Sequence, residues 1–307
     1  MSFQAGDLVL LWRGIDDIAI YRSFAFGYGI PLPQAQTSTR PSFAFLPNQH
    51  QALMVWPDGS SDSLVWSVDP DFSNQAFIPG AGTSWAACVT PWNGGAIAVW
   101  PGVVGDPRIW VSTYGFNGNS AQPWSNPTPA LCPTGIITTA ITPAICSDPD
   151  GNLMMVWRGA GSNDSLYYAT STNGIDWTTA SAQIPGGAST VAPALAYFDG
   201  YFVLVFKGSE NDDTIYSSTW VSSSPNSNKW TNTTTCGSHG TSDGPCLIAA
   251  DSCLVMAWKG IPGDNNLYYA TNNGTGAETW GNQSVIQNSG SSVGPSGYYY
   301  VGPGPVL

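Results

Sequence analysis

The sequence predicts an all-β protein, a six-bladed β-propeller built from four-stranded antiparallel blades. Three observations lead to this fold class: the composition, an internal repeat, and the way the two chain ends complement each other. Charged residues are only 9% of the 307 residues, whereas Gly (35), Pro (24), Trp (14) and Tyr (13) are abundant. The few Glu and Lys cannot fill the faces of long amphipathic helices. Short strands joined by turns are therefore expected.

One segment recurs along the chain. Its clearest copies begin at Pro143, Pro193 and Pro245, and fainter copies begin at Pro41 and near Trp85. Each copy reads as a short strand of small residues, a turn, an apolar strand, a Gly-containing loop and a strand rich in aromatic residues. The aromatic residue that closes the apolar strand recurs with separations of 44, 44, 57, 49 and 52, at Trp12, Trp56, Trp100, Trp157, Phe206 and Trp258. Six copies at this spacing are typical of propeller blades.

The chain ends supply the third observation. The first copy lacks its leading strand, and the missing Pro-plus-strand piece stands near the C-terminus, at 295–302. We therefore expect residues 295–301 to pair beside residues 8–12 and to close a ring, which leaves no unpaired sheet edge there. One domain over 1–307 is predicted, with blades at 295–307 plus 1–40, 41–84, 85–142, 143–192, 193–244 and 245–294.

Composition also limits the partners and the location. A net charge of −12 with eight basic residues argues against nucleic acid, which is bound through basic surfaces. No apolar run is long enough for membrane insertion. The N-terminus has no signal-peptide pattern, so we expect a cytoplasmic protein or one released without a signal peptide. With two His, a metal site is not expected, and neither is a cofactor. All six Cys are predicted to be unpaired, since three replace small core residues.

The repeat has the form aromatic–basic–Gly–loop–Asp–x–x–Leu/Ile–Tyr. Trp157-Arg158-Gly159 with Asp164 and Leu166-Tyr167 shows it, and so do the copies at Phe206 and Trp258. This pattern resembles bacterial and fungal propeller lectins, and more loosely the sialidase-like fold with its Asp-box hairpin, to which residues 170–177 bear a degenerate likeness. The resemblance implies a carbohydrate-binding propeller.

Catalysis is not expected. Sialidase chemistry requires three Arg, a Tyr with an adjacent Glu, and an acid, but neither Glu210 nor Glu278 lies near an Arg-containing motif. Other glycosidases need a pair of carboxylates, and no such pair stands out in one blade alone. Most Asp residues occupy turn positions, where backbone reasons favour them.

The candidate binding residues are a basic residue after the strand-two aromatic, an Asp before the Tyr strand, and nearby aromatic side chains. Two interpretations stay open: the basic/Asp pair ties blades together, or it binds sugar hydroxyls beside an aromatic wall. The predicted ligand-binding set is Arg13, Asp17, Tyr21, Arg158, Asp164, Tyr168, Trp177, Lys207, Asp213, Tyr216, Trp230, Lys259, Asp264, Tyr269 and Trp280.

Two copies carry Pro57 and Pro101 in place of the basic residue. A purely architectural pair would be needed in all six blades, so its presence in four adjacent blades favours binding. The sequence thus predicts a lectin with several equivalent low-affinity glycan sites between blades. Its partners would be glycans or glycoproteins, and a homo-oligomer is possible. The alternatives are a protein-interaction scaffold and a glycoside hydrolase.

Overall fold

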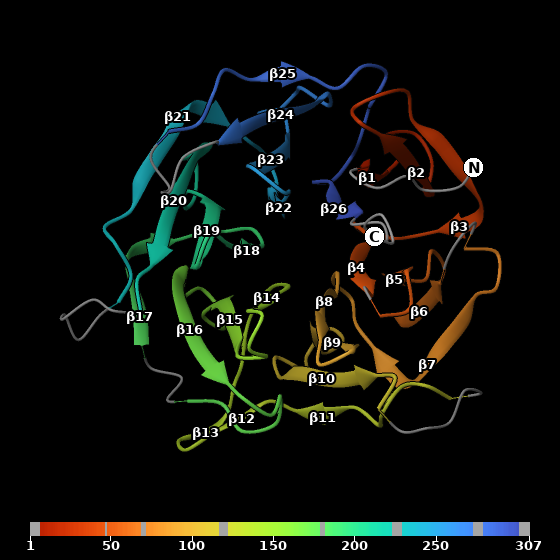
Figure 1. The fold of residues 1–307 in the computed structure, drawn as a ribbon, viewed down its shortest axis with the longest axis vertical. Coiled ribbons are helices and arrows are strands. Elements are labelled where there is room, and N and C mark those ends of the chain that lie inside the picture. Colours follow the sequence, from red (N-terminus) through yellow and green to blue (C-terminus); the bar gives the residue numbers. More distant parts are fainter. Residues whose placement is uncertain are drawn as a thin grey trace, which may run out of the picture.

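The computed structural model shows six four-stranded antiparallel sheets arranged in a ring around a central axis (Figure 1). It describes residues 7–46, 48–68, 72–116, 122–178, 182–222, 229–272 and 279–300. Strands, turns and bends make up this part of the chain, which contains no helix. Accordingly, no described segment is a helix able to cross a membrane. The predicted all-β, six-bladed propeller is confirmed.

Within each blade the strands follow one another from the axis outward. The first three blades are β26 (Ser296–Tyr300), β1 (Asp7–Arg13), β2 (Ala19–Phe24), β3 (Ile30–Gln36); β4 (Ser42–Leu46), β5 (Gln51–Pro57), β6 (Ser63–Val68), β7 (Ala76–Gly82); and β8 (Cys88–Trp92), β9 (Gly95–Pro101), β10 (Ile109–Tyr114), β11 (Thr128–Pro129). The other three are β14 (Ala144–Ser147), β15 (Leu153–Arg158), β16 (Ser165–Ser171), β17 (Ala182–Ala188); β18 (Ala194–Phe198), β19 (Tyr201–Lys207), β20 (Thr214–Trp220), β21 (Thr234–Gly240); and β22 (Cys246–Ala249), β23 (Leu254–Lys259), β24 (Leu267–Asn272), β25 (Ser284–Val285).

The two ends of the chain build the first blade together. Strand β26 pairs antiparallel with β1 in a register that sets Leu8 opposite Tyr299 and Leu11 opposite Ser296. Figure 1 shows β26 on the inner side of β1, next to β4 and β22. The predicted closure is confirmed for 296–300; residue 301 lies outside the described residues. Tyr298 fixes this strand further, because it stacks on Phe43 at 5.4 Å between ring centroids.

The second strand of each blade is buried on both faces, as its continuous apolar sequence predicts. Strands β9 and β23 are buried along their whole length. Each strand packs between the neighbouring blades, so the hydrophobic core is a ring of clusters that lie between blades. One cluster joins Leu8, Leu10 and Trp12 of the first blade to Val255 and Ala257 of the last. The ring is therefore closed by side-chain packing as well as by β26.

A buried hydroxyl follows the outermost strand of every blade. These residues are at most 2% exposed: Thr37, Thr83, Thr139, Ser189, Thr241 and Ser291. All except Thr83 stand four positions before the Pro that precedes the next inner strand. In the last four, the hydroxyl donates to a carbonyl two residues later, at 2.7–2.9 Å. The link between blades is thus a repeated turn held by a side chain.

One link between blades is longer than the others. Between β11 and β14 the chain inserts a small hairpin, β12 (Leu131–Cys132) and β13 (Gly135–Ile136). This hairpin accounts for the separation of 57 residues between Trp100 and Trp157. Trp177 donates its backbone N–H to the carbonyl of Leu131 at 2.9 Å, which attaches the hairpin to the fourth blade. None of the six Cys, all of which lie within the described residues, takes part in a disulfide.

Deletion of β26 tests the closure. A chain ending at Gly294 loses the inner strand of the first blade, exposes the edge of β1 and leaves Phe43 without its stacked ring. We expect its free energy of unfolding to fall by at least about 3 kcal/mol, the typical cost of losing one buried aromatic side chain. Urea denaturation followed by tryptophan fluorescence measures this.

The matched control is a chain ending at Tyr300, which keeps β26 and lacks only residues 301–307. Equal stability of the two truncated chains would show that β26 does not hold the ring closed.

Candidate functional site

In five blades, the loop between the second and third strands ends in an Asp or Asn that hydrogen-bonds to an aromatic side chain four residues later. We call these residues the loop pairs. Their bonds span 2.8–3.0 Å between donor and acceptor, and the pairs are Asp17–Tyr21, Asp106–Trp110, Asn163–Tyr167, Asp212–Tyr216 and Asp264–Tyr268. The blade that carries Pro101 therefore has a loop pair too.

A glycine makes room for each of these acidic or amide side chains. A Cβ atom on Gly260 would lie 2.5 Å from the Asp264 carboxylate, and one on Gly102 would lie 2.5 Å from that of Asp106. These separations are far inside van der Waals contact. The Gly of the aromatic–basic–Gly motif is therefore required because the loop folds its own side chain back over the backbone.

The tyrosine of four loop pairs also packs on the aromatic residue that closes the second strand of the same blade. Register places the two opposite each other on adjacent strands, as for Trp157 and Tyr167 or Trp258 and Tyr268. Their rings stack with centroids 6.2 Å apart in both blades. Packing and hydrogen bonding thus fix the loop pair in one geometry.

The predicted basic/Asp pairs are realised unevenly. Arg158 donates from Nε to Asp164 at 2.8 Å, and a second bond from Nη2 completes the ion pair. Lys207 lies 3.4 Å from Asp213, but its ammonium also donates to the carbonyls of Glu210 and Asp212. The Lys207 side chain is only 5% exposed. In this blade the basic residue therefore organises its own loop.

The other two predicted pairs do not form ion pairs, and their part in sugar binding stays a prediction. Lys259 donates to Ser242 and to the backbone carbonyl of Asp264, while the Asp264 carboxylate binds Tyr268 and Asn266. Asp264 thus takes the position of Asp212 rather than that of Asp213, one residue earlier in the loop.

Arg13 and Asp17 likewise bond to other groups and not to each other. It donates to the carbonyl of Thr37 at 3.2 Å and to Ser292, while Asp17 binds Tyr21 and the Ala19 amide. Both side chains are thereby committed to different partners, and the predicted Arg13/Asp17 pair does not form.

Several predicted aromatic walls are also corrected. Trp177 and Trp230 are 2% and 5% exposed, so they pack in the core and cannot form an open surface. Tyr168 and Tyr269 lie on the face opposite to the loop pairs. Tyr168 packs on Trp230, and Tyr269 stacks on Phe26 at 3.6 Å between centroids.

Trp280, by contrast, is half-buried and packs at the edge of a core cluster beside Tyr268. Tyr21 and Tyr216 do belong to loop pairs. At the blade loops, the predicted residues that are half-buried are Arg13, Tyr21, Arg158, Asp164, Asp213, Tyr216 and Asp264.

A pocket of about 240 Å³ lies where the β12–β13 hairpin meets the loop of the fourth blade. The hairpin side contributes Thr134, Ile136 and Thr138, and the fourth blade contributes Asn163 and Tyr167, with Trp157 behind them. Thr134 and Ile136 are exposed. The pocket therefore combines an apolar wall, an aromatic ring and several hydroxyl or amide groups.

Tyr167 differs from its counterparts in the direction of its hydrogen bonds. In the first, fifth and sixth blades the Tyr hydroxyl donates to an Asp carboxylate. Tyr167 instead accepts from the amides of Asn163 at 2.9 Å and Gln183 at 3.0 Å. A phenol has two acceptor positions and one O–H, so both acceptor positions are filled and the O–H is free to donate.

Sequence reasoning missed Asn163, Tyr167, Thr134 and Thr138. Two signals mark them. The unusual 57-residue separation locates the inserted hairpin, and a spacing of four residues from Gly to Asp or Asn recurs in four of the five loop pairs. The fourth blade also differs from the fifth and sixth at the loop-pair position, because Asn163 stands where those blades have Asp.

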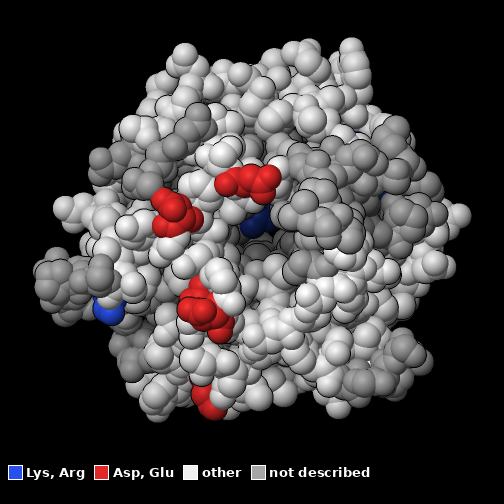
Figure 2. Space-filling view, viewed as in Figure 1, with Lys and Arg blue, Asp and Glu red and all other residues white. Residues whose placement is uncertain are grey.

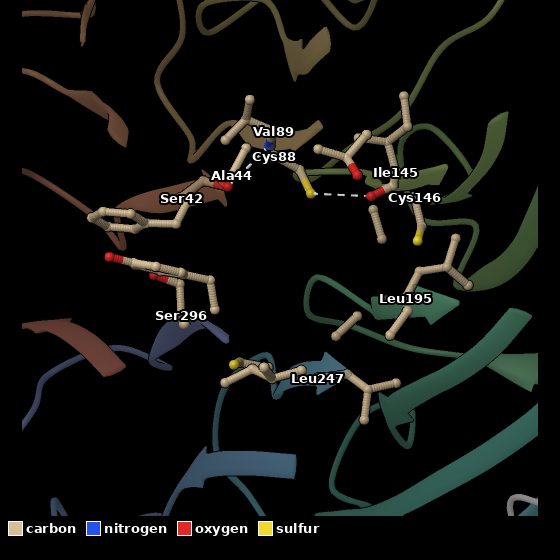
Figure 3. A pocket seen from close by; sticks show the side chains of 18 of the residues that line it. Ser42, Ala44, Cys88, Val89, Ile145, Cys146, Leu195, Leu247 and Ser296 are labelled. Atoms are coloured by element: carbon tan, nitrogen blue, oxygen red, sulfur yellow. Dashed lines mark hydrogen bonds between the residues drawn. The ribbon is translucent and has the colours of Figure 1, made fainter. Parts of the chain in front are cut away.

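A second cavity, of about 410 Å³, occupies the centre of the ring. The six inner strands line it, each in contact with the next around the circle. Figure 3 shows Cys88, Ile145, Cys146, Leu195 and Leu247 around one open space. The thiol of Cys88 donates to the carbonyl of Ile145 at 3.9 Å.

Charged groups are few in this cavity. Among its described lining residues, Arg40 and Asp148 carry the charges. Figure 2 shows basic atoms inside the central hollow and acidic side chains near its edge. Burial raises the pKa of the Cys146 and Cys246 thiols to about 12, so these thiols stay protonated at neutral pH.

Neither protein-family models nor curated proteins match the sequence. Several solved structures share the fold. The Aleuria aurantia lectin in complex with Fucα1-6GlcNAc is 9% identical, with a TM-score of 0.65 over 92% of each chain. An α-L-arabinanase from Penicillium chrysogenum is 15% identical, with a TM-score of 0.61 over 87% of this chain and 90% of that chain.

A structure of a nidogen/laminin complex also aligns, at 14% identity and a TM-score of 0.58 over 95% of this chain and 98% of that one. A lectin, an α-L-arabinanase and a chain of a nidogen/laminin complex thus share this architecture with the protein. The likeness identifies the fold, and the function has to be argued from the site. No family match supports the Asp-box likeness of residues 170–177.

Replacement of Gly260 by Ala tests the loop pair. The new Cβ would displace the Asp264 carboxylate from Tyr268, and we expect the variant to lose about 1–3 kcal/mol of stability, as overpacked sites do. Gly290→Ala is the control, because its Cβ would meet its nearest neighbour at an ordinary 3.4 Å. Denaturant unfolding compares the two. Similar losses in both variants would contradict a specific role for the Gly260 position.

The buried thiols predict a fall in stability at high pH. Burial raises the pKa of Cys146, Cys236 and Cys246 to about 12 from an ordinary 9.0, so the unfolded chain releases these protons first. Stability should be complete below pH 9.0 and fall as pH rises toward 12. The slope contributed by three thiols is at most about 4 kcal/mol per pH unit.

Urea unfolding across this pH range should show a shallower decline in the triple Cys→Ala variant. Cys132→Ala, in the β12–β13 hairpin, is the control and should keep the slope of the unmodified protein. An unchanged slope in the triple variant would rule out the thiols as the cause.

Proposed function

We propose that this protein is a carbohydrate-binding propeller and that its best-formed site is the pocket between the third and fourth blades. One observation carries the proposal. The Tyr167 hydroxyl accepts two hydrogen bonds from the protein and presents its O–H to a pocket that also contains hydroxyl, amide and apolar groups. Such a preorganised donor has little conformational entropy left to lose on binding.

The chemistry of the pocket fits a pyranose. A sugar ring offers hydroxyls around its edge and an apolar C–H face. Tyr167 can donate to a sugar oxygen, Thr134 and Thr138 can donate or accept, and Ile136 supplies an apolar wall. The Arg158–Asp164 ion pair lies in the same blade loop and stiffens it, with side chains 12% and 23% exposed. These features favour a shallow polar site for a monosaccharide or a glycan end.

The lining of the two cavities argues for binding rather than hydrolysis. Glycoside hydrolysis requires two carboxyl groups facing each other across the scissile bond. Among the described lining residues of both cavities, Asp148 is the single carboxylate. Fold likeness to an arabinanase therefore carries less weight for this chain than the likeness to a fucose-binding lectin, and fucosides are the first glycans to test.

Other blade junctions are weaker candidates. At the loops of Lys207 and Lys259 the ammonium groups bind backbone carbonyls, and the Tyr hydroxyls bind carboxylates. A sugar there would have to replace bonds that the protein already makes. The proposal therefore assigns one principal site per chain, with further equivalent sites as an alternative that binding stoichiometry distinguishes.

A glycan array followed by calorimetric titration tests the function. We expect binding of a small set of glycans with a stoichiometry near one per chain. Tyr167→Phe removes the free O–H and should weaken binding about tenfold, the effect of one hydrogen bond. Tyr268→Phe is the matched control, because it removes the same atom from a loop pair whose hydroxyl binds a carboxylate.

Equal affinity of both variants and the unmodified protein would exclude this pocket. If each of the two variants instead bound fewer glycans per chain, by the same amount, several equivalent sites would be favoured. Absence of binding to any glycan would overturn carbohydrate recognition and leave the protein-interaction scaffold as the better explanation.

A further inference from the structure

We propose that the central cavity binds a small apolar carboxylate, with Arg40 holding the carboxylate group. This site is separate from the carbohydrate pocket and does not depend on it. Its volume of about 410 Å³ falls within the range of small-molecule sites in proteins. Such sites are mainly apolar, with a few fixed polar groups that orient the ligand.

The apolar part of the cavity comes from the inner strands. Phe43 and Phe45 of β4 line it. Ile145 of β14, Leu195 of β18 and Leu247 of β22 line it as well (Figure 3). Cys88, Cys146 and Cys246 add protonated thiols, which behave as small apolar groups. An aliphatic or aromatic body of moderate size would be surrounded by apolar side chains around the circumference of the ring.

Arg40 supplies the polar end. It precedes β4, and its Nη1 donates to the carbonyls of Gly244 at 3.3 Å and Pro245 at 3.2 Å, just before β22. Because these strands belong to blades on either side of β26, the side chain reaches over the start of that strand. The carbonyls fix the guanidinium, and the bonds that the structure shows for it all leave from Nη1.

Arg40 forms no ion pair among the described residues, and the Asp243 carboxylate at the same end of the ring accepts instead from the Gly244 and Gly294 amides. Arg108 and Arg158 each form an ion pair with an Asp in their own loop, whereas no Asp or Glu oxygen of the described residues lies within 4.0 Å of Arg40. Two carbonyl dipoles compensate a guanidinium only in part inside an apolar cavity. A ligand carboxylate would complete the compensation through Nε and Nη2, which present parallel N–H donors.

The other end of the cavity sets the orientation. Asp148 follows the inner strand β14, whereas Arg40 precedes the inner strand β4, so the two charges lie at opposite ends of the strand layer. The acidic edge seen in Figure 2 disfavours a carboxylate there. The ligand would therefore lie with its carboxylate toward Arg40 and its apolar end toward Asp148.

Isothermal titration with octanoate, octan-1-ol and octylamine tests the proposal on the full-length protein. Octanoate should bind about ten- to a hundredfold more tightly than the uncharged alcohol, the effect of a charge-assisted hydrogen bond. Tighter binding of octylamine would overturn the proposal, because the acidic edge would then dominate.

Two variants and a control locate the site. Arg40→Gln should weaken octanoate about ten- to a hundredfold and leave octanol and glycan binding unchanged. Leu195→Trp, which fills the cavity and keeps Arg40, should abolish binding of both octanoate and octanol, so the test does not rest on the folding of one variant. Arg108→Gln, outside the cavity, is the matched control. Octanoate affinity that is unchanged in Arg40→Gln, or in Leu195→Trp, would refute the site.

Discussion

The pairing of β26 with β1 is the constraint on which the rest of this molecule depends. Five blades are each made from one continuous stretch of chain, but the first blade needs both ends. Without β26, the cavity would lack one of its six walls, and the packing of β4 would lose Tyr298. The central cavity follows from closure because it lies inside the ring, whereas the other candidate site lies outside it, where the β12–β13 hairpin meets the fourth blade.

Closure also explains why the core consists of clusters between blades. Each second strand is buried on both faces, so its residues pack against two neighbouring blades at once. The repeated Ser or Thr turns set the step from one blade to the next, and their buried hydroxyls satisfy backbone carbonyls that the turn would otherwise leave unpaired. A ring built in this way tolerates variation in its loops, as the inserted β12–β13 hairpin shows.

The fold could be predicted because it depends on patterns that recur six times. Aromatic residues at regular spacing and complementary chain ends are visible without coordinates. The site was less predictable, because it depends on differences of one residue. Whether a loop carries its acid at the position of Asp212 or of Asp213 decides if that acid binds a Tyr or a Lys. Similarly, Tyr167 and Tyr168 are neighbours in sequence but face opposite sides of the strand.

The fourth blade contains the candidate carbohydrate site and keeps the same four-strand architecture as the other blades. An Asp at the loop-pair position accepts a hydrogen bond from the tyrosine hydroxyl, so the phenol has no O–H left to donate to a ligand. Asn at the same position donates instead, and with Gln183 it reverses the role of the phenol while the ring keeps its stack on Trp157. The inserted hairpin then places Thr134 and Ile136 across from the freed donor. Two local changes, the Asn at the loop-pair position and the inserted hairpin, therefore distinguish this blade from those in which the Tyr hydroxyl binds a carboxylate. Neither change disturbs the packing that holds the blade in the ring.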